Sequence, residues 1–163
     1  MHETPEDLRW LQDVLDQSHA AAGSHLRSIF TEERRLTADQ LSELLTGVQV
    51  LNVATVTARG EPRVAPVDGL FYRGRWHFGS SPDSVRFRHL RRRPQISASH
   101  TRGEELAVIV HGTAALVHPH AAEHQGFRAF LLEVYGRDWE SWAGEAPYAR
   151  IDPDRMYSFA FQP

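Results

Sequence analysis

The sequence contains no cysteine and no lysine. Without cysteine, the protein has no disulfides, no thiolate ligands for zinc and no thiol nucleophile. All 18 basic residues are arginine, so Schiff-base catalysis by lysine and the phosphate-binding lysine of a P-loop are excluded as well. Any phosphate must therefore be held by arginine, by hydroxyl groups and by backbone N–H groups.

Long apolar stretches are missing too, and none approaches the length of a membrane span. The first seven residues are acidic and polar and do not resemble a secretory signal. The net charge of −3 argues against a general nucleic-acid-binding protein. The 163 residues fit one domain. We therefore expect a soluble cytoplasmic protein with neither a membrane nor a nucleic acid as a partner.

The first part of the chain has the pattern of helices. Leucine and valine recur at helical spacing between residues 8 and 15, and a second helical segment is expected at about residues 24–33. Thr37 is suited to cap a short helix that ends at Gly47. We treat residues 1–36 as an N-terminal helical arm.

From residue 48 onward the pattern changes to short strands rich in valine, leucine and threonine, separated by turn residues. Several strands are apolar on both faces, which an open sheet with one face in water would not need. A small closed barrel with helices packed outside would need it. We expect a mainly β fold with flanking helices, in which six or so antiparallel strands form a barrel over residues 37–163. The expected strands are residues 49–57, 62–72, 75–80, 95–100, 106–117 and 156–161, and the expected helices of this domain are residues 82–92 and 119–135.

The segment from Trp76 to Pro94 carries the chemistry. A strand runs into small hydroxyl residues and then into a helix, for which Ser81 is the expected N-cap and Pro82 the first residue. The free N–H groups and the dipole of such a helix start attract an anion. Hydroxyl donors and a planar guanidinium fork add to this attraction. The expected phosphate-binding residues are Ser80, Ser81, Ser84 and Arg86.

The same segment also fits a simpler role, that of a capped helix with a solvated basic face. Asp83 favours this interpretation, because a carboxylate near the first turn repels phosphate. The arginines at positions 91–93 fit a solvated helix end beside the C-terminal dipole. Spacing alone leaves both interpretations open.

Five motifs follow one another between about residues 40 and 135. They are an alanine-threonine strand before a glycine turn, a strand with prolines among apolar residues, an aromatic hairpin, a Ser-x-Arg helix with a proline stop, and a glycine-containing strand. In this order they resemble the FMN-binding split β-barrel superfamily, the group related to pyridoxamine 5'-phosphate oxidase that includes deazaflavin-dependent reductases. The motifs occupy residues 53–60, 62–67, 70–78, 84–86 with 93–94, and 108–114.

This resemblance implies a flavin-type cofactor, FMN first and the deazaflavin coenzyme F-420 as the alternative. It implies an oxidoreductase that passes a hydride or electrons to a small organic substrate, and a homodimer with a shared cofactor site. The longer acidic tail of the deazaflavin would need arginines beyond Arg86, such as Arg88 and Arg91. By resemblance, the phosphate would be held by the residues named above, and the ring would be lined by Arg63, Val64, Ala65, Pro66 and Val67.

The chain also departs from the family. It lacks the C-terminal strand and the arginine-rich substrate signature of true pyridoxamine 5'-phosphate oxidases, and Arg86 stands where lysine is common. No catalytic acid or base is evident, and a cofactor that carries the hydride does not require one. A binding module for flavin or haem without turnover therefore remains an alternative function.

Histidines at positions 111–124 and aromatic residues near the C-terminus are further candidates. His118 and His120 could place two imidazoles on one side of an extended segment. No acidic neighbour stands at ligand spacing, so we expect surface histidines and no metal. Trp139, Trp142 and Tyr148 are candidates for an aromatic lid from a partner subunit, with ordinary packing as the default.

Overall fold

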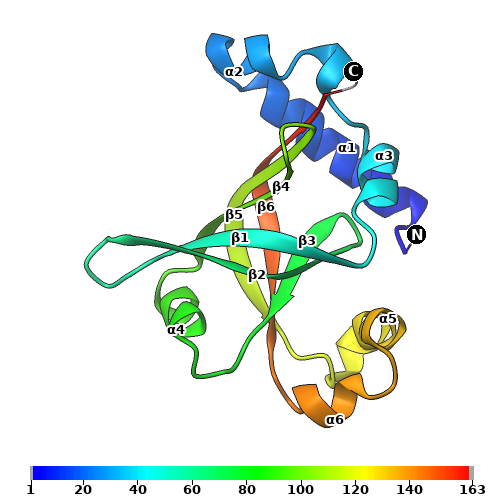
Figure 1. Cartoon of the computed structure of the whole chain (residues 1–163), viewed down its shortest axis with the longest axis vertical. Coiled ribbons are helices and arrows are strands. Elements are labelled where there is room, and N and C mark those ends of the chain that lie inside the picture. The colour runs from blue at the N-terminus through cyan, green and yellow to red at the C-terminus, as the bar shows by residue number, and fades with distance from the viewer. Residues whose placement is uncertain (1, 162–163) are drawn as a thin grey trace.

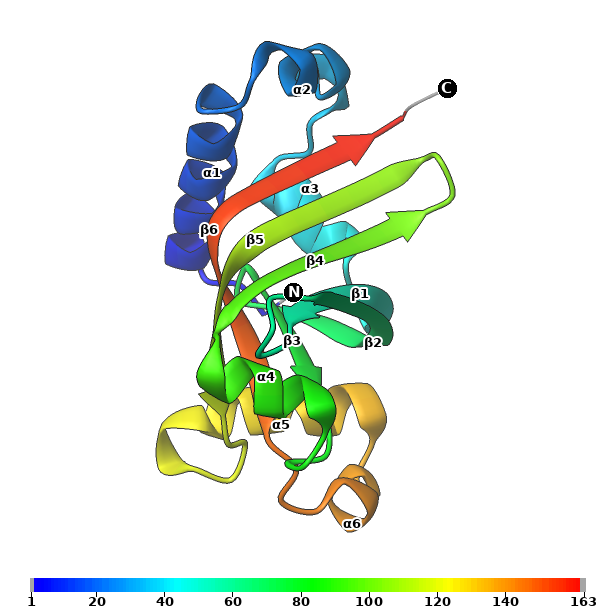
Figure 2. The same ribbon diagram turned by 90° about the vertical axis from the view of Figure 1, so that its left-hand side faces the viewer.

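The structure, a computed structural model, describes residues 2–161. Its centre is a closed barrel of six antiparallel strands in the order β1-β2-β3-β6-β5-β4 (Figures 1 and 2). The predicted fold class is confirmed. The strands are β1 (Val48–Val56), β2 (Pro62–Tyr72), β3 (Arg75–Gly79), β4 (Gln95–Arg102), β5 (Leu106–Val117) and β6 (Tyr148–Ala160).

The barrel interior is filled by the inward-facing half of each strand. Trp76 and Phe78 of β3 are fully buried there, and so are Leu51 of β1 and Ile151 of β6. On the outer face, His77 of β3 and Tyr148 of β6 are buried as well, because the helices that link β5 to β6 along the chain cover them. The double apolar pattern of the sequence therefore has two causes, a filled barrel and a covered outer face.

The N-terminal segment lies against this barrel. It comprises α1 (Pro5–Ala20), α2 (Ser24–Ile29), the 3-10 helix η1 (Glu32–Arg34) and α3 (Ala38–Leu44). Helix α1 packs on β6 (Figure 2), with Leu11 fully buried and the Ser18 hydroxyl accepting the Met156 N–H at 2.9 Å. The predicted cap at Thr37 is confirmed, since its hydroxyl accepts the Gln40 N–H in a reciprocal capping box.

A second apolar cluster lies at the other end of the molecule (Figure 1). Along the chain, the 3-10 helix η2 (Ala122–His124), α5 (Gln125–Tyr135) and α6 (Trp139–Ala143) lie between β5 and β6. Helices α5 and α6 supply most of the cluster, and residues of β2, β5 and β6 complete it. Phe127, Phe130 and Leu131 of α5 pack on Tyr72 and on the buried Trp139. This cluster covers the outer face of β3, next to the segment singled out in the sequence.

Three predicted starts are wrong by three residues or more, and the helical segment expected at about residues 24–33 already ends at Ile29. The helix expected at 82–92 is α4 (Val85–Arg92), and the helix expected at 119–135 begins only at Gln125, after two tight turns. Strand β6 begins at Tyr148 instead of residue 156 and continues through Pro153. Its register against β5 shifts there, because His111 pairs with Arg155 and Gly112 with Pro153, which leaves Asp154 as an extra residue in β6. A Cβ atom at Gly112 would overlap the Asp152 carbonyl oxygen, so glycine permits this close approach.

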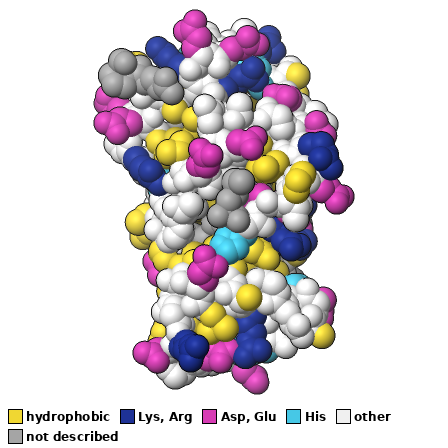
Figure 3. Space-filling model, turned by 90° about the vertical axis from the view of Figure 1, so that its right-hand side faces the viewer, with side chains coloured by type: hydrophobic (Ala, Val, Ile, Leu, Met, Phe, Trp, Pro, Cys, Tyr) yellow, Lys and Arg dark blue, Asp and Glu magenta, His cyan; other side chains and the backbone are white. Residues whose placement is uncertain are grey.

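Acidic and basic side chains are interspersed on the face of the molecule that Figure 3 shows. Among the described residues, no helix is long and apolar enough to cross a membrane.

Candidate functional site

The barrel opens where β2 and β3 separate. Their ladder runs from the Tyr72–Arg75 pair to the Gly69–Phe78 pair, and the rest of β2 pairs only with β1. Asp68 and Gly79, the next residues of the two strands, line a cavity of about 670 Å³. We call this cavity the split cleft. Its lining consists of Asp68, Gly79, Ser80, Ser81, Pro82, Tyr135, Trp142, Ala143, Glu145, Ala146 and Tyr148.

Ser80 and Ser81 line one wall of the cleft, immediately after β3. The backbone is anchored there, because the Ser80 N–H donates to the Pro147 carbonyl at 3.5 Å and the Ser84 N–H donates to the Ser81 carbonyl at 2.9 Å. The hydroxyl groups of Ser80 and Ser81 make no hydrogen bond within residues 2–161. They are therefore free to donate to a ligand.

Ser84 caps helix α4, where the sequence predicted Ser81. Its hydroxyl accepts the Phe87 N–H at 3.3 Å, and Pro82 and Asp83 lie in the preceding turn. A cap three residues later moves the first free N–H groups of the helix to Val85 and Arg86. Part of the hydrogen-bonding capacity of Ser84 is thereby used within the protein.

Arg86 is half-buried beside the barrel end, with its guanidinium carbon 6.0 Å from the centre of the Phe78 ring. Burial lowers its pKa, but an arginine keeps its charge at neutral pH. Within the described part of the chain, no carboxylate forms an ion pair with it. A partly buried cation of this kind attracts an anionic ligand.

Strand β2 carries the five residues expected to line a ring, but they do not share one face. Arg63, Ala65 and Val67 alternate with Val64 and Pro66 along β2. The edge of this segment that faces away from β1 has no strand partner among residues 2–161. A flat ligand would therefore meet backbone groups of this edge and the side chains of only one face. The proline fits such an edge position.

Arg63 is exposed and already has polar partners. Its guanidinium forms an ion pair with Glu61 at 2.9 Å and donates to the Pro62 carbonyl at 3.1 Å. Of the nine predicted site residues, only Ser80 and Ser81 line the split cleft. Ser84, Arg86 and residues 63–67 lie on the segments that adjoin it.

An aromatic wall completes the cleft on the side of α5 and α6. The rings of Tyr135 and Trp142 meet edge to face with centroids 5.5 Å apart, and burial raises the pKa of Tyr135 and of Tyr148. Both phenols therefore stay neutral at physiological pH. The contribution of Tyr135 was missed, because nothing in its local sequence signals this long-range contact.

The expected lid is corrected at two of its three positions, because Trp139 and Tyr148 are buried. Trp139 is fully buried in its own chain, where its indole N–H donates to the Tyr148 hydroxyl at 3.2 Å. Trp142, by contrast, is 63% exposed and stands at the cleft. A partner subunit could thus contact Trp142 but not Trp139.

The histidines at positions 120 and 124 contact backbone carbonyl groups of the protein. His120 Nε2 lies 3.2 Å from the Gly144 carbonyl oxygen, and His124 Nδ1 lies 3.2 Å from the His118 carbonyl oxygen. Over the described residues, no group of three histidine or acidic side chains is placed to hold a metal ion.

Comparison with known proteins places this geometry in a family. The family model described as pyridoxamine 5'-phosphate oxidase matches residues 37–159, whereas no curated protein matches the chain. Among solved structures, a conserved hypothetical protein of Mycobacterium tuberculosis has a TM-score of 0.66 at 16% identity, over 80% of this chain and 88% of its own.

Two further solved structures share the fold. An FAD-binding protein of Mesorhizobium loti has a TM-score of 0.61 at 20% identity, over 79% of this chain and 98% of its own. The haem storage protein of Vibrio cholerae has a TM-score of 0.62 at 18% identity, over 75% of this chain and 95% of its own. At these identities the likeness concerns the fold alone.

Proposed function

The chain belongs to the pyridoxamine 5'-phosphate oxidase family, and from this premise we propose that it is an oxidoreductase that binds FMN at the split cleft. The observation that carries the proposal is the opening between β2 and β3, which has a free strand edge on one side and unengaged donors on the other. A bound flavin supplies the hydride or electron transfer, and the protein supplies binding and orientation.

The residues after β3 fit a phosphate. Among residues 2–161, the Ser80 and Ser81 hydroxyls are free donors and Arg86 has no carboxylate partner. The start of α4 adds N–H groups with the positive end of its dipole. Asp83 is exposed, so its carboxylate is screened by water from a phosphate at the helix start. We therefore assign the phosphate end of the cofactor to Ser80, Ser81, Ser84 and Arg86.

The edge of β2 fits the ring. Backbone groups of residues 63–67 can exchange hydrogen bonds with the polar edge of a flavin, as the unpaired side of a strand does with any extended partner. Arg63 can shift from Glu61 toward negative charge on the reduced ring. Tyr135, Trp142 and Tyr148 lie on the opposite side of the cleft, where they would exclude water from a small organic substrate.

A homodimer follows from the same proposal. Val50 of β1 and Val64 of β2 are 61% and 71% exposed on the outer face of the barrel. Exposed apolar side chains on a well-ordered sheet favour coverage by another protein surface. We propose that a second copy covers this face and contributes to the same cofactor site.

The deazaflavin coenzyme F-420 is the second candidate. Arg88 and Arg91 line a cavity of about 530 Å³ beside α4, and the rest of that lining contains further arginines but no acidic residue. Such a basic surface suits the acidic tail of this coenzyme. The coenzyme with its intact tail should then bind more tightly than the deazaflavin without the tail. R88A should remove this difference in affinity.

Reduction of the bound cofactor tests the enzyme assignment. The cofactor-loaded protein is mixed with a nicotinamide donor and then with electron acceptors, and the cofactor spectrum is followed. Bleaching by the donor and recovery with an acceptor support an oxidoreductase. A stable spectrum with every donor and acceptor would instead identify a storage or sensing module for flavin, and a haem spectrum would identify a haem-binding one.

A further inference from the structure

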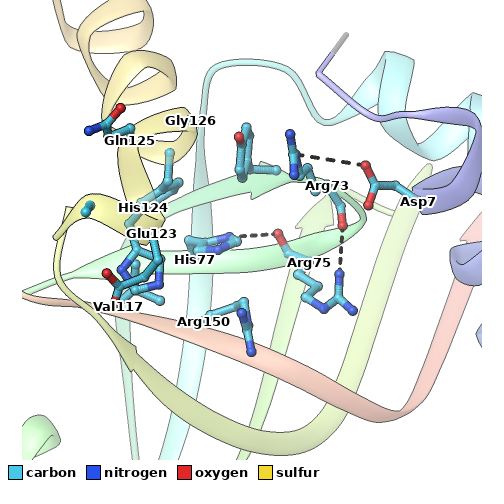
Figure 4. A pocket seen from close by; sticks show the side chains of 13 residues that line it. Asp7, Arg73, Arg75, His77, Val117, Glu123, His124, Gln125, Gly126 and Arg150 are labelled. Atoms are coloured by element: carbon cyan, nitrogen blue, oxygen red, sulfur yellow. Dashed lines mark hydrogen bonds and ion pairs between the residues drawn. The ribbon is translucent and has the colours of Figure 1, made fainter. Parts of the chain in front are cut away.

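A second cavity, of about 500 Å³, lies outside the split cleft and shares no lining residue with it. It is enclosed by the β2–β3 hairpin, by β6 and by the start of α5 (Figure 4). Arg73, Arg75 and Arg150 all reach its wall. We call it the arginine pocket.

His77 is the most informative residue of this pocket, because it is only 4% exposed. Its Nδ1 lies 3.1 Å from the Arg75 carbonyl oxygen (Figure 4), which can only accept, so Nδ1 carries the proton. Nε2 is then a bare acceptor, and no donor within residues 2–161 reaches it. Burial lowers the pKa of His77 to about 3, so Nε2 stays unprotonated at neutral pH.

The His77 ring is held in one orientation. It stacks on Phe127 of α5 with ring centroids 4.5 Å apart and an interplanar angle of 29°. Nε2 is not itself a buried atom: it is the part of the ring that water can reach at the pocket wall. A ligand that brings an O–H or N–H group into the pocket can take the place of that water and donate to Nε2.

The guanidinium groups around His77 have more donors than their carboxylates can use. Asp152 accepts from Arg150 at 2.7 and 2.8 Å and lies 3.3 Å from Arg75. Arg73 lies 4.0 Å from Asp7, a carboxylate that also accepts two hydrogen bonds within its capping box. The remaining N–H groups can serve the oxygens of an anion.

Helix α5 adds N–H groups to the same wall. Its N-cap, His124, makes no side-chain cap hydrogen bond, and the first two residues, Gln125 and Gly126, line the pocket. Uncapped N–H groups at a helix start attract negative charge. Two carboxylates, Asp7 and Glu123, also line the pocket. Asp7 faces Arg73, and the Glu123 side chain is exposed to water, which weakens its repulsion of an anion.

We propose that the arginine pocket binds a small oxyanion that carries its own hydroxyl group. The anionic oxygens would lie against Arg75, Arg150 and the start of α5, and the hydroxyl would donate to Nε2 of His77. Hydrogen phosphate and small 2-hydroxy carboxylates share this chemistry. His77 would exclude oxyanions that lack a proton, because a second acceptor opposite Nε2 is repelled.

Paired ligands test the proposal on the full-length protein at neutral pH. Calorimetric titration compares inorganic phosphate with sulfate, and glycolate with acetate, since each pair differs in the hydroxyl donor. We expect the hydroxyl-bearing member of at least one pair to bind about tenfold more tightly, as one hydrogen bond would provide. A preference in the first pair identifies phosphate as the ligand type, and a preference in the second identifies a hydroxy acid. Equal binding within both pairs, or no binding, overturns the proposal.

Two variants, a control variant and one spectrum separate the roles of His77 and Arg150. H77F keeps a ring against Phe127 and should remove the preference, whereas R150Q should weaken both members of the preferred pair and R155Q, on the exposed part of β6, should weaken neither. Should H77F fail to fold, the nitrogen resonance of His77 Nε2 in the unaltered protein decides. It should shift when the preferred ligand is added, and an unmoved resonance contradicts the proposal.

Discussion

Gly69 and Phe78 form the last residue pair of the ladder between β2 and β3. A Cβ atom at Gly69 would lie 2.6 Å from the Cβ of Leu51 and 3.2 Å from the Trp76 ring. Strand β2 can therefore approach these two side chains so closely only because this residue is glycine. Beyond the pair, β2 stays with β1 and β3 turns toward α4. The opening that we assign to the cofactor begins at this point.

Arg86 should account for much of the phosphate affinity. R86A is expected to weaken FMN binding by about 10- to 150-fold, the range for a loss of about 1.5–3 kcal/mol from charge-assisted hydrogen bonds. R92A, at the far end of the same helix, is the control for general charge. Fluorescence titration with FMN measures both, and equal losses in the two variants would remove Arg86 from the site.

The two serines flanking the Pro82 turn should behave differently. S84A removes the cap of α4 and should lower the free energy of unfolding by about 0.5–2 kcal/mol. S81A removes a hydroxyl that has no hydrogen-bond partner in the described part of the chain, so it should leave stability unchanged and weaken FMN binding. Urea unfolding of both variants checks the cap. If S81A were less stable than S84A, Ser81 and not Ser84 would be the cap of α4.

Gly79 should be essential to the shape of the split cleft. A Cβ atom there would lie 2.9 Å from the Tyr148 ring, so G79A forces that ring into the cleft or strains β3. We expect a loss of about 1–3 kcal/mol in stability, as for other overpacked sites, together with weaker FMN binding. G23A is the control, because no atom lies within 4 Å of its added Cβ. Thermal unfolding that places G79A at the melting temperature of the unaltered protein would contradict this packing.

His77 should make stability depend on pH. Its pKa is about 3 in the folded chain and about 6.5 unfolded, so the unfolded state binds more protons between these values. Stability from this residue is therefore present above pH 6.5 and is lost as the pH falls toward 3. The expected loss is about 2 kcal/mol between pH 7 and pH 5. Urea unfolding at both pH values should show a smaller loss for H77F, and identical losses would argue against a neutral buried imidazole.

The outer face of β1 and β2 should be the dimer contact. V64D places a charge at a position that is 71% exposed, so it should leave the fold intact but produce a monomer with weakened FMN binding. I29D changes a similar apolar residue on α2 and is the control. Light scattering after size exclusion gives both masses. A monomeric unaltered protein that binds FMN fully would contradict the shared site.

The sequence predicts the barrel strands well because the patterns that indicate them involve residues close together in the chain. Strand β5 was predicted at its observed bounds, and the cap at Thr37 was confirmed, since alternation and capping boxes involve residues close in the chain. Strand β6 is predicted only over residues 156–161, although it begins at Tyr148. Only the extra residue Asp154 and the close approach to Gly112, on the neighbouring strand β5, explain how Pro153 continues in the sheet.

The candidate site was predicted less completely, for the same physical reason. Ser80 and Ser81 could be found because hydroxyl residues follow a strand and precede a helix. Tyr135 reaches the cleft only through the packing of α5, and the arginine pocket brings together Asp7, Arg73 and Arg150 from three separated segments. Contacts of this kind depend on topology and leave no local signal.

The absorption spectrum of the protein as purified, followed by mass analysis of any small molecule released on denaturation, tests the central claim most directly. We predict a flavin-type spectrum and the release of FMN, or of the deazaflavin F-420, from the native protein. A colourless protein that releases nothing, and that takes up neither compound when it is added in large excess, would contradict the assignment of the split cleft as a flavin site.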